Sequence, residues 1–224
     1  MKYAAPLLTI LVLAGCATTK TDIRNDPEAV KYDPATSARI RIITSPNTQG
    51  YFVSGQTCEQ FFNVSVRKDA ESDLVTPAHP SGGLSGMLTN VFRNNVIGMP
   101  ASIATREINS TPRFYDEHVV PAGKPLIVRL YYRDSRLICR PAPRVFTPQP
   151  GVDYEFEYLE PENGFFSQYK CTTAFRTLNT QGSTTTETPT ETAMCIHSPD
   201  GYHTVDLQKL NDILKAAGAH SGQE

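Results

Sequence analysis

Histidines beside acidic residues are the first places in this sequence where chemistry could occur. His197 and His203 flank a predicted turn that contains Asp200, so these side chains could share a metal or serve a hydrolase. Asp116 and His118 alternate along one predicted strand and could form an ion pair on one of its faces. No H-E-x-x-H motif accompanies the histidines. The pattern therefore favours exposed imidazoles over a catalytic or metal site.

Other catalytic patterns are incomplete. The run Gly83-Leu84-Ser85-Gly86 approaches the G-x-S-x-G motif of serine hydrolases, but Met87 occupies its last position. The sequence contains neither a phosphate-binding P-loop nor a dinucleotide-binding glycine motif. The formal net charge is −2 and no basic block is present, which argues against a nucleic-acid partner. We therefore expect no catalytic residues, no metal, no cofactor and no enzyme activity.

The N-terminus has the features of an export signal. Lys2 precedes an apolar stretch, residues 4–14, which is shorter than the roughly 20 residues that cross a bilayer. The stretch ends in Leu13-Ala14-Gly15-Cys16, which resembles the lipobox of bacterial lipoproteins. That resemblance implies removal of residues 1–15 and lipidation of the Cys16 thiol. Two or three acyl chains would anchor the protein stably to a membrane.

The residues after Cys16 bear on location. In Gram-negative lipoproteins Asp at the next position commonly signals retention at the inner membrane, so the resemblance implies that Ala17 directs the protein to the outer membrane, facing the periplasm. Residues 16–36 are polar and include Pro27 and Pro34. This composition predicts a lipidated flexible tether that spans about 20–25 Å.

The other cysteines predict disulfide bonds. Cys58, Cys139, Cys171 and Cys195 are an even set, which in an exported chain indicates a disulfide framework. We favour the pairs Cys58–Cys139 and Cys171–Cys195, because the second pair flanks a Thr-rich segment typical of a hairpin connection. A metal site is the alternative, but no C-x-x-C spacing supports it.

Alternating apolar and polar residues predict short strands over residues 37–224. The clearest segments are 38–42, 62–67, 126–133, 153–158 and 169–175, with a short final strand at 193–196. Residues 69–113 lack alternation, and the Thr-rich residues 179–192 are typical of a solvated loop. Apolar spacing predicts a C-terminal helix at about 204–218, capped by Thr204. We predict one mainly β domain, an antiparallel β-sandwich with a C-terminal α-helix and long irregular loops.

Aromatic and basic residues supply a candidate binding surface. Tyr115, Arg129, Tyr131 and Arg133 lie in predicted strands and would form a recognition surface if they share an exposed sheet face. The simpler interpretation is that such aromatic residues belong to the core.

Two segments, Asn95–Ser102 and Phe114–Leu126, together with the lipobox resemble a group of small uncharacterised proteobacterial outer-membrane lipoproteins. A weaker likeness is to the β-sandwich outer-membrane lipoprotein of type VI secretion systems. The resemblance implies export and outer-membrane placement. We therefore expect an envelope lipoprotein that acts as a binding or assembly module with an envelope protein partner. The alternatives are an envelope hydrolase or metal-binding protein, and a type VI secretion-like accessory lipoprotein.

Overall fold

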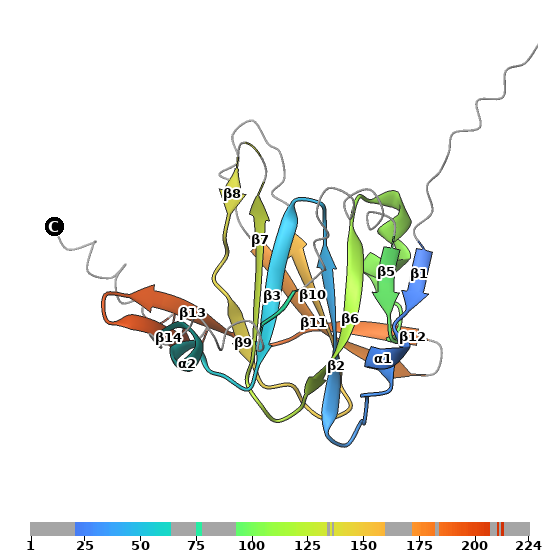
Figure 1. Ribbon diagram of the computed structural model, residues 1–224, viewed down its shortest axis with the longest axis horizontal. Helices are drawn as coiled ribbons and strands as arrows, with labels where there is room; N and C mark the ends of the chain where they lie inside the picture. The colour runs from blue at the N-terminus through green and yellow to red at the C-terminus, as the bar shows by residue number, and fades with distance from the viewer. Residues whose placement is uncertain are drawn as a thin grey trace, which may run out of the picture.

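Alternating apolar and polar residues fold the chain into two β-sheets that pack against each other (Figure 1). The computed structural model describes residues 21–63, 75–77, 93–133, 135, 137–159, 172–181, 184–206, 210 and 212. These residues form two antiparallel-rich sheets and few helices. The prediction of a mainly β, sandwich-like fold is therefore confirmed.

We call the sheet that contains β2 the first sheet. Its strand order is β1 (Thr21–Arg24), β5 (Arg93–Val96), β6 (Phe114–Pro121), β2 (Ser37–Thr44), β10 (Asp153–Leu159), β11 (Thr172–Gln181) and β12 (Thr184–Pro189). The pairs β1–β5, β5–β6 and β2–β10 are parallel, and the remaining pairs are antiparallel. The first sheet is therefore antiparallel-rich but mixed.

The second sheet is antiparallel throughout its described pairs. Its strand order is β14 (Gly201–Val205), β13 (Ala193–Ser198), β9 (Arg144–Phe146), β7 (Leu126–Arg133), β3 (Thr48–Ser54) and β4 (Val75–Pro77), and β8 (Ile138–Cys139) pairs with β7. Among the described strands, the chain passes from the first sheet to the second three times, between β2 and β3, between β6 and β7, and between β12 and β13. At these crossings consecutive strands lie in different layers, whereas β10–β11, β11–β12 and β13–β14 are consecutive antiparallel pairs within one sheet.

The main core lies between the two sheets. It contains one apolar face each of β2 and β7, together with aromatic side chains of β10 and β11. Its most deeply buried members are Ala38, Ile40, Ile42, Val120, Leu126, Val128, Cys139, Phe156 and Tyr158. Each large apolar side chain that is fully buried here contributes about 1.5–3 kcal/mol to folding.

A second apolar cluster covers the outer face of the second sheet. The helix α2 (Cys58–Asn63) places Cys58 and Phe61 against Val53 and Ile127 of the sheet. Phe62 stacks on Tyr202 of β14, with 4.4 Å between the ring centroids. The predicted strand at 62–67 is wrong for Phe62 and Asn63, which belong to α2, and residues 64–67 lie outside the described part.

Residues 21–36 belong to the folded domain, so the prediction of a flexible tether over 16–36 is wrong for them. Strand β1 pairs with β5, and Asn25 caps the short helix α1 (Asp26–Ala29). Glu28 accepts a hydrogen bond from the backbone amide of Val119 at 2.8 Å. Polar residues that suggested a coil instead satisfy backbone donors of the sheet. Residues 16–20 lie outside the described part.

Other predicted boundaries also change. The Thr-rich residues 179–192, expected to be a solvated loop, include the end of β11 and all of β12, which pair antiparallel with Thr180 opposite Thr185. Thr204 lies in β14 opposite Cys195, so the predicted helix cannot begin there. Most of the predicted helix, residues 204–218, lies outside the described residues.

The segment from residue 93 to residue 113 was predicted to be part of an irregular loop. Instead, β5 is followed by the helices α5 (Ile103–Arg106) and η1 (Ile108–Ser110).

Candidate functional site

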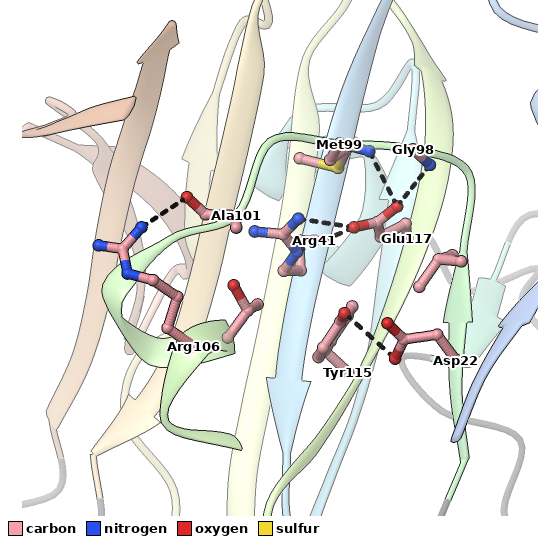
Figure 2. Close-up of a pocket in the computed structure, with 10 residues that line it drawn as sticks. Asp22, Arg41, Gly98, Met99, Ala101, Arg106, Tyr115 and Glu117 are labelled. Carbon is pink, nitrogen blue, oxygen red and sulfur yellow. Dashed lines mark hydrogen bonds and ion pairs between the residues drawn. The ribbon is translucent and has the colours of Figure 1, made fainter. Parts of the chain in front are cut away.

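A cavity of about 330 Å³ lies on the outer face of the first sheet. The connection from β5 to α5 passes over this face, so that β2 and β6 form the floor and the connection forms the cover (Figure 2). The polar and charged residues that line the cavity are Asp22, Arg41, Thr105, Arg106, Tyr115 and Glu117. We call it the first cavity.

Arg41 is the central charge of this face. It lies on β2 directly opposite Glu117 of β6 on one side and Glu155 of β10 on the other. Its Nη2 atom is 2.6 Å from Oε1 of Glu117, and its Nη1 atom is 3.1 Å from Oε2 of Glu155. Burial alone would lower the pKa of Arg41, but the two carboxylates outweigh it and raise the pKa. Arg41 therefore stays charged although only 1% of its side chain is exposed.

Glu117 fixes the cover of the first cavity. Its Oε2 atom accepts hydrogen bonds from three consecutive backbone amides, those of Ile97, Gly98 and Met99, at 2.7, 3.0 and 3.2 Å. Gly98 has a φ of 98°, which favours glycine and lets the amides converge on one oxygen. Figure 2 shows the amides of Gly98 and Met99 pointing at this carboxylate. Glu117 thus ties the connection to the sheet while its other oxygen binds Arg41.

The ion pairs continue across the sheet. Glu117, Arg41, Glu155 and Arg176 occupy directly opposite positions on four neighbouring strands, and we call them the charged row. Arg176 Nη1 lies 3.0 Å from Glu155, and its Nη2 lies 2.7 Å from Glu157 in the same strand. Because each charge in the row has an opposite neighbour, the row can be buried beneath the cover.

Tyr115 lies at the wall of the first cavity nearest to β1. Its hydroxyl lies 3.5 Å from Oδ1 of Asp22, which also accepts a hydrogen bond from Asn94 at 2.7 Å. Burial, reinforced by the Asp22 charge, raises the pKa of Tyr115, so the phenol remains protonated at neutral pH. The guanidinium of Arg41 lies 5.0 Å from the centre of its ring, within the range of a cation–π contact.

The lining residues of the first cavity can bind a polar ligand. Its lining residues offer hydrogen-bond donors on Arg106 and Tyr115 and an acceptor on Asp22. Among these lining residues there is no histidine, cysteine or serine that could act as a nucleophile or general base near neutral pH. Arg41 and Glu117 already bind each other, and they also bind Glu155 and the backbone amides of Ile97–Met99, respectively. The arrangement suits a small polar molecule or ordered water.

The structure divides the predicted binding surface. Tyr115 faces outward from the first sheet, whereas Arg129, Tyr131 and Arg133 alternate along the outward side of β7 in the second sheet. The three β7 residues share their face with side chains of β3 and β8, because the cross-strand pairs are Tyr51 with Arg129, Gln49 with Tyr131 and Ile138 with Arg133. We call these six residues the Tyr–Arg face: Gln49, Tyr51, Arg129, Tyr131, Arg133 and Ile138.

The observed disulfide corrects the predicted pairing. Cys58 bonds to Cys195, with 5.5 Å between their Cα atoms, so both favoured pairs, Cys58–Cys139 and Cys171–Cys195, are wrong. The bond connects α2 to β13 across the outer face of the second sheet. Cys139 is also disulfide-bonded. Cys16 and Cys171 lie outside the described residues. Cys171 was expected to reach Cys195 across a hairpin, but the partner of Cys195 is Cys58, which α2 places beside β13.

The histidines form no metal site in the described part of the chain. His203 Nε2 lies 3.2 Å from Asp200, and His197 packs edge-on against Tyr202, so the two imidazoles have separate partners. The pKa of Asp200 is lowered, chiefly by a hydrogen bond from Ser198 and also by His203. No group of three or more potential metal ligands occurs among the described residues. His118 packs against Phe52, with 5.0 Å between ring centroids.

Comparisons with known proteins give no relative for this arrangement. No protein-family model matches the chain, and neither the curated proteins nor the solved structures contain a match. Within the part of the chain that the structure describes, no helix is long and apolar enough to cross a membrane.

Sequence reasoning missed the charged row. Arg39 and Arg41 lie in the predicted strand 38–42, and Glu155 and Glu157 in the predicted strand 153–158. The sequence did contain a signal for the charged row: every second residue of β2 is an arginine around Arg39 and Arg41, and every second residue of β10 is acidic. Such patterns indicate that the two strands are neighbours with oppositely charged faces. Arg39 and Asp153 bear this out, with Nε and Oδ1 2.6 Å apart.

Proposed function

We propose that this protein is an outer-membrane lipoprotein that binds an acidic envelope protein, with acyl chains on Cys16 as its membrane anchor. The Tyr–Arg face is the surface that we assign to the partner. One observation carries this proposal. Arg129 and Arg133 lie on the same side of an accessible strand, and no described acidic side chain forms an ion pair with either.

The composition of the Tyr–Arg face supports a role in protein recognition. Tyrosine and arginine are enriched among the residues that contribute most to protein–protein binding, because they combine apolar area with directed hydrogen bonds. Tyr131 and Gln49 are joined by a hydrogen bond of 2.9 Å, which restricts both side chains before a partner arrives. Ile138 is 52% exposed and adds an apolar contact beside Arg133.

The charge of this face indicates the chemistry of the partner. Arg129 is only partly exposed, and its Nη1 atom contacts the Tyr51 hydroxyl at 3.4 Å, a neutral partner. A carboxylate from another protein would supply the missing opposite charge and could bind a guanidinium with two hydrogen bonds. An acidic segment with aromatic or aliphatic neighbours therefore fits the Tyr–Arg face best.

The experiment for the partner compares variants of the full-length protein. We would purify epitope-tagged protein from envelopes in mild detergent and quantify the co-purifying proteins by mass spectrometry. The double variant Arg129→Ala/Arg133→Ala should reduce recovery of the partner at least about tenfold, as expected when two central arginines are lost. The control is Arg93→Ala/Lys124→Ala, which removes two exposed positive charges elsewhere on the domain.

The two outcomes separate clearly. A partner retained by wild type and by the control, but lost from the Arg129/Arg133 variant, supports the proposal. If no envelope protein depends on Arg129 and Arg133, the Tyr–Arg face is not the interaction surface.

The anchor has its own test. Replacing Cys16 with Ala should move the protein from the membrane fraction to the soluble fraction, because the acyl chains can no longer be attached. Labelling with a radioactive fatty acid should be lost in the same variant. A Cys16→Ala protein that still sediments with outer membranes would contradict the lipoprotein assignment.

A further inference from the structure

A larger cavity, of about 720 Å³, opens where the two sheets diverge. It lies between β9 of the second sheet and the start of β10 in the first, and the connection from β12 to β13 forms one wall. Its volume falls within the range of about 300–1,000 Å³ that is usual for small-molecule sites. We call it the second cavity. None of its lining residues belongs to the first cavity or to the Tyr–Arg face.

The floor of the second cavity is aromatic and held rigidly. Phe146 and Tyr154 both line it, with their ring centroids 4.9 Å apart in an edge-to-face arrangement. Behind them Phe175 packs against Phe146 at 4.4 Å, and all three rings are continuous with the main core. The rings are therefore positioned before any ligand enters, which reduces the entropy lost on binding.

Tyr154 also brings a polar group to the floor. Its hydroxyl oxygen accepts a hydrogen bond from the backbone amide of Gln149 at 3.0 Å, so the phenolic proton remains available to an acceptor. Burial raises the pKa of Tyr154, and the phenol remains neutral at physiological pH. The floor thus offers ring surface and one hydrogen-bond donor, and it adds no negative charge.

The charged side chains among the described lining residues of the second cavity are acidic. Glu191 and Asp206 are its ionisable lining residues besides Tyr154, and no lysine, arginine or histidine lines it among the described residues. Glu191 is exposed at the rim, in the connection between β12 and β13. Carboxylates at the mouth of a low-dielectric cavity repel anions and attract cations.

We propose that the second cavity binds an organic cation with an apolar chain, such as an aliphatic amine. The chain packs on Phe146 and Tyr154, and the ammonium group lies towards the carboxylate of Glu191. The proposal does not depend on lipidation of Cys16 or on the Tyr–Arg face, because it uses neither.

The position of the second cavity makes it accessible in an anchored protein. Strand β1 begins at the end of the first sheet where β2 ends, because β1 runs parallel to β5 and β6, which lie antiparallel to β2. Tyr154 lies at the opposite end, near the start of β10, which runs parallel to β2. The aromatic floor is therefore far from Thr21, where the N-terminal segment enters the domain.

The test uses three ligands that share an eight-carbon chain and differ in terminal charge: diaminooctane, octanediol and suberate. Isothermal titration calorimetry on the purified wild-type protein should detect saturable binding of diaminooctane. Octanediol should bind at least about tenfold more weakly, a difference of about 1.4 kcal/mol, because it lacks the charge. Suberate should show no binding, since its carboxylates meet the carboxylate of Glu191.

Variants then assign the site. Glu191→Gln keeps the shape of the side chain and should weaken diaminooctane binding about tenfold, as expected for the loss of one charge contact. The matched control is Glu107→Gln, which makes the same change at an exposed residue after α5, outside the second cavity. Circular dichroism of both variants checks that the fold is retained.

The contrary results are equally specific. Binding of suberate or octanediol as tight as that of diaminooctane would overturn the cation preference. Equal affinity of wild type and Glu191→Gln, or no saturable binding of the diamine, would overturn the site.

Discussion

Arg41 and Glu117 form an ion pair that is almost entirely removed from solvent. Nη2 of Arg41 lies 2.6 Å from Oε1 of Glu117, and their side chains are 1% and 2% exposed. The pair lies on the outer face of a sheet, where solvated polar residues are usual. It is buried because Glu117 also holds the backbone of Ile97–Met99 over that face.

Breaking this pair should be costly. Arg41→Met leaves the carboxylates of Glu117 and Glu155 buried without their shared cation, so we expect a loss of about 3–5 kcal/mol in the free energy of unfolding. Urea denaturation followed by circular dichroism measures it. The control is Arg24→Ala, which breaks an exposed pair with Asp26 and should cost at most about 1 kcal/mol. Equal losses in the two variants would show that burial of Arg41 has no energetic consequence.

The disulfide should stabilise the domain strongly because it closes a long loop. Cys58 and Cys195 are 137 residues apart, and the chain-entropy treatment gives about 5 kcal/mol for a loop of this length. Peptide mapping without reduction should recover a Cys58–Cys195 link. The double variant Cys58→Ser/Cys195→Ser should lose about this much free energy of unfolding, measured by urea denaturation. A mapped Cys58–Cys139 link would contradict the structure.

The N-terminal segment should behave as part of the fold. The amides of Asn25, Ala29 and Val119 donate hydrogen bonds to Val96, Asn25 and Glu28, respectively, and should exchange slowly in hydrogen–deuterium exchange. Glu28→Ala removes the acceptor for Val119 and should increase exchange at that amide, at a cost of about 1 kcal/mol. Rapid exchange of residues 21–36 in wild type would restore the tether interpretation.

Acid should weaken the contact between α2 and β14. Both carboxylate oxygens of Glu59 bind Thr204, one through its backbone amide and one through its hydroxyl. Burial opposes the charged form, but these hydrogen bonds outweigh it and lower the pKa of Glu59 from 4.5. A lowered folded-state pKa contributes stability above the unfolded value, and this stability is lost as pH falls through the folded value. Thermal melts of wild type and Glu59→Gln should therefore converge as pH falls below about 4. A difference that does not change between neutral pH and pH 3 would contradict this linkage.

The sequence predicted strands correctly where apolar and polar residues alternate regularly along the chain. Strands β2, β7 and β10 fall at the expected residues, because one apolar face is required wherever a sheet covers a core. Alternation alone cannot assign a strand to a layer. Tyr51–Val53 follows β2 closely, yet β3 belongs to the second sheet and pairs with β7 instead of β2.

Long-range pairing explains the parts that the sequence did not predict. The partner of Arg41 is 76 residues away in Glu117, and the partner of Cys58 is 137 residues away in Cys195. Neither can be selected from local pattern, since several acidic residues and cysteines have equivalent local surroundings. The Thr-rich segment was missed for a different reason, because β-branched threonines favour strands as well as solvated loops.

The early start of β1 has a mechanical consequence for the lipoprotein that we propose. Residues 17–20 alone separate Cys16 from Thr21, and the five Cα–Cα steps between them extend to only about 17–18 Å. The acyl chains would therefore hold one end of the sandwich close to the headgroups and restrict its tilt. Because β7 ends at the end where β1 begins, as Figure 1 shows, the Tyr–Arg face would stand nearly upright on the membrane. Such a domain meets its neighbours by lateral diffusion in the bilayer plane, and an integral membrane protein with an acidic periplasmic surface is within its reach.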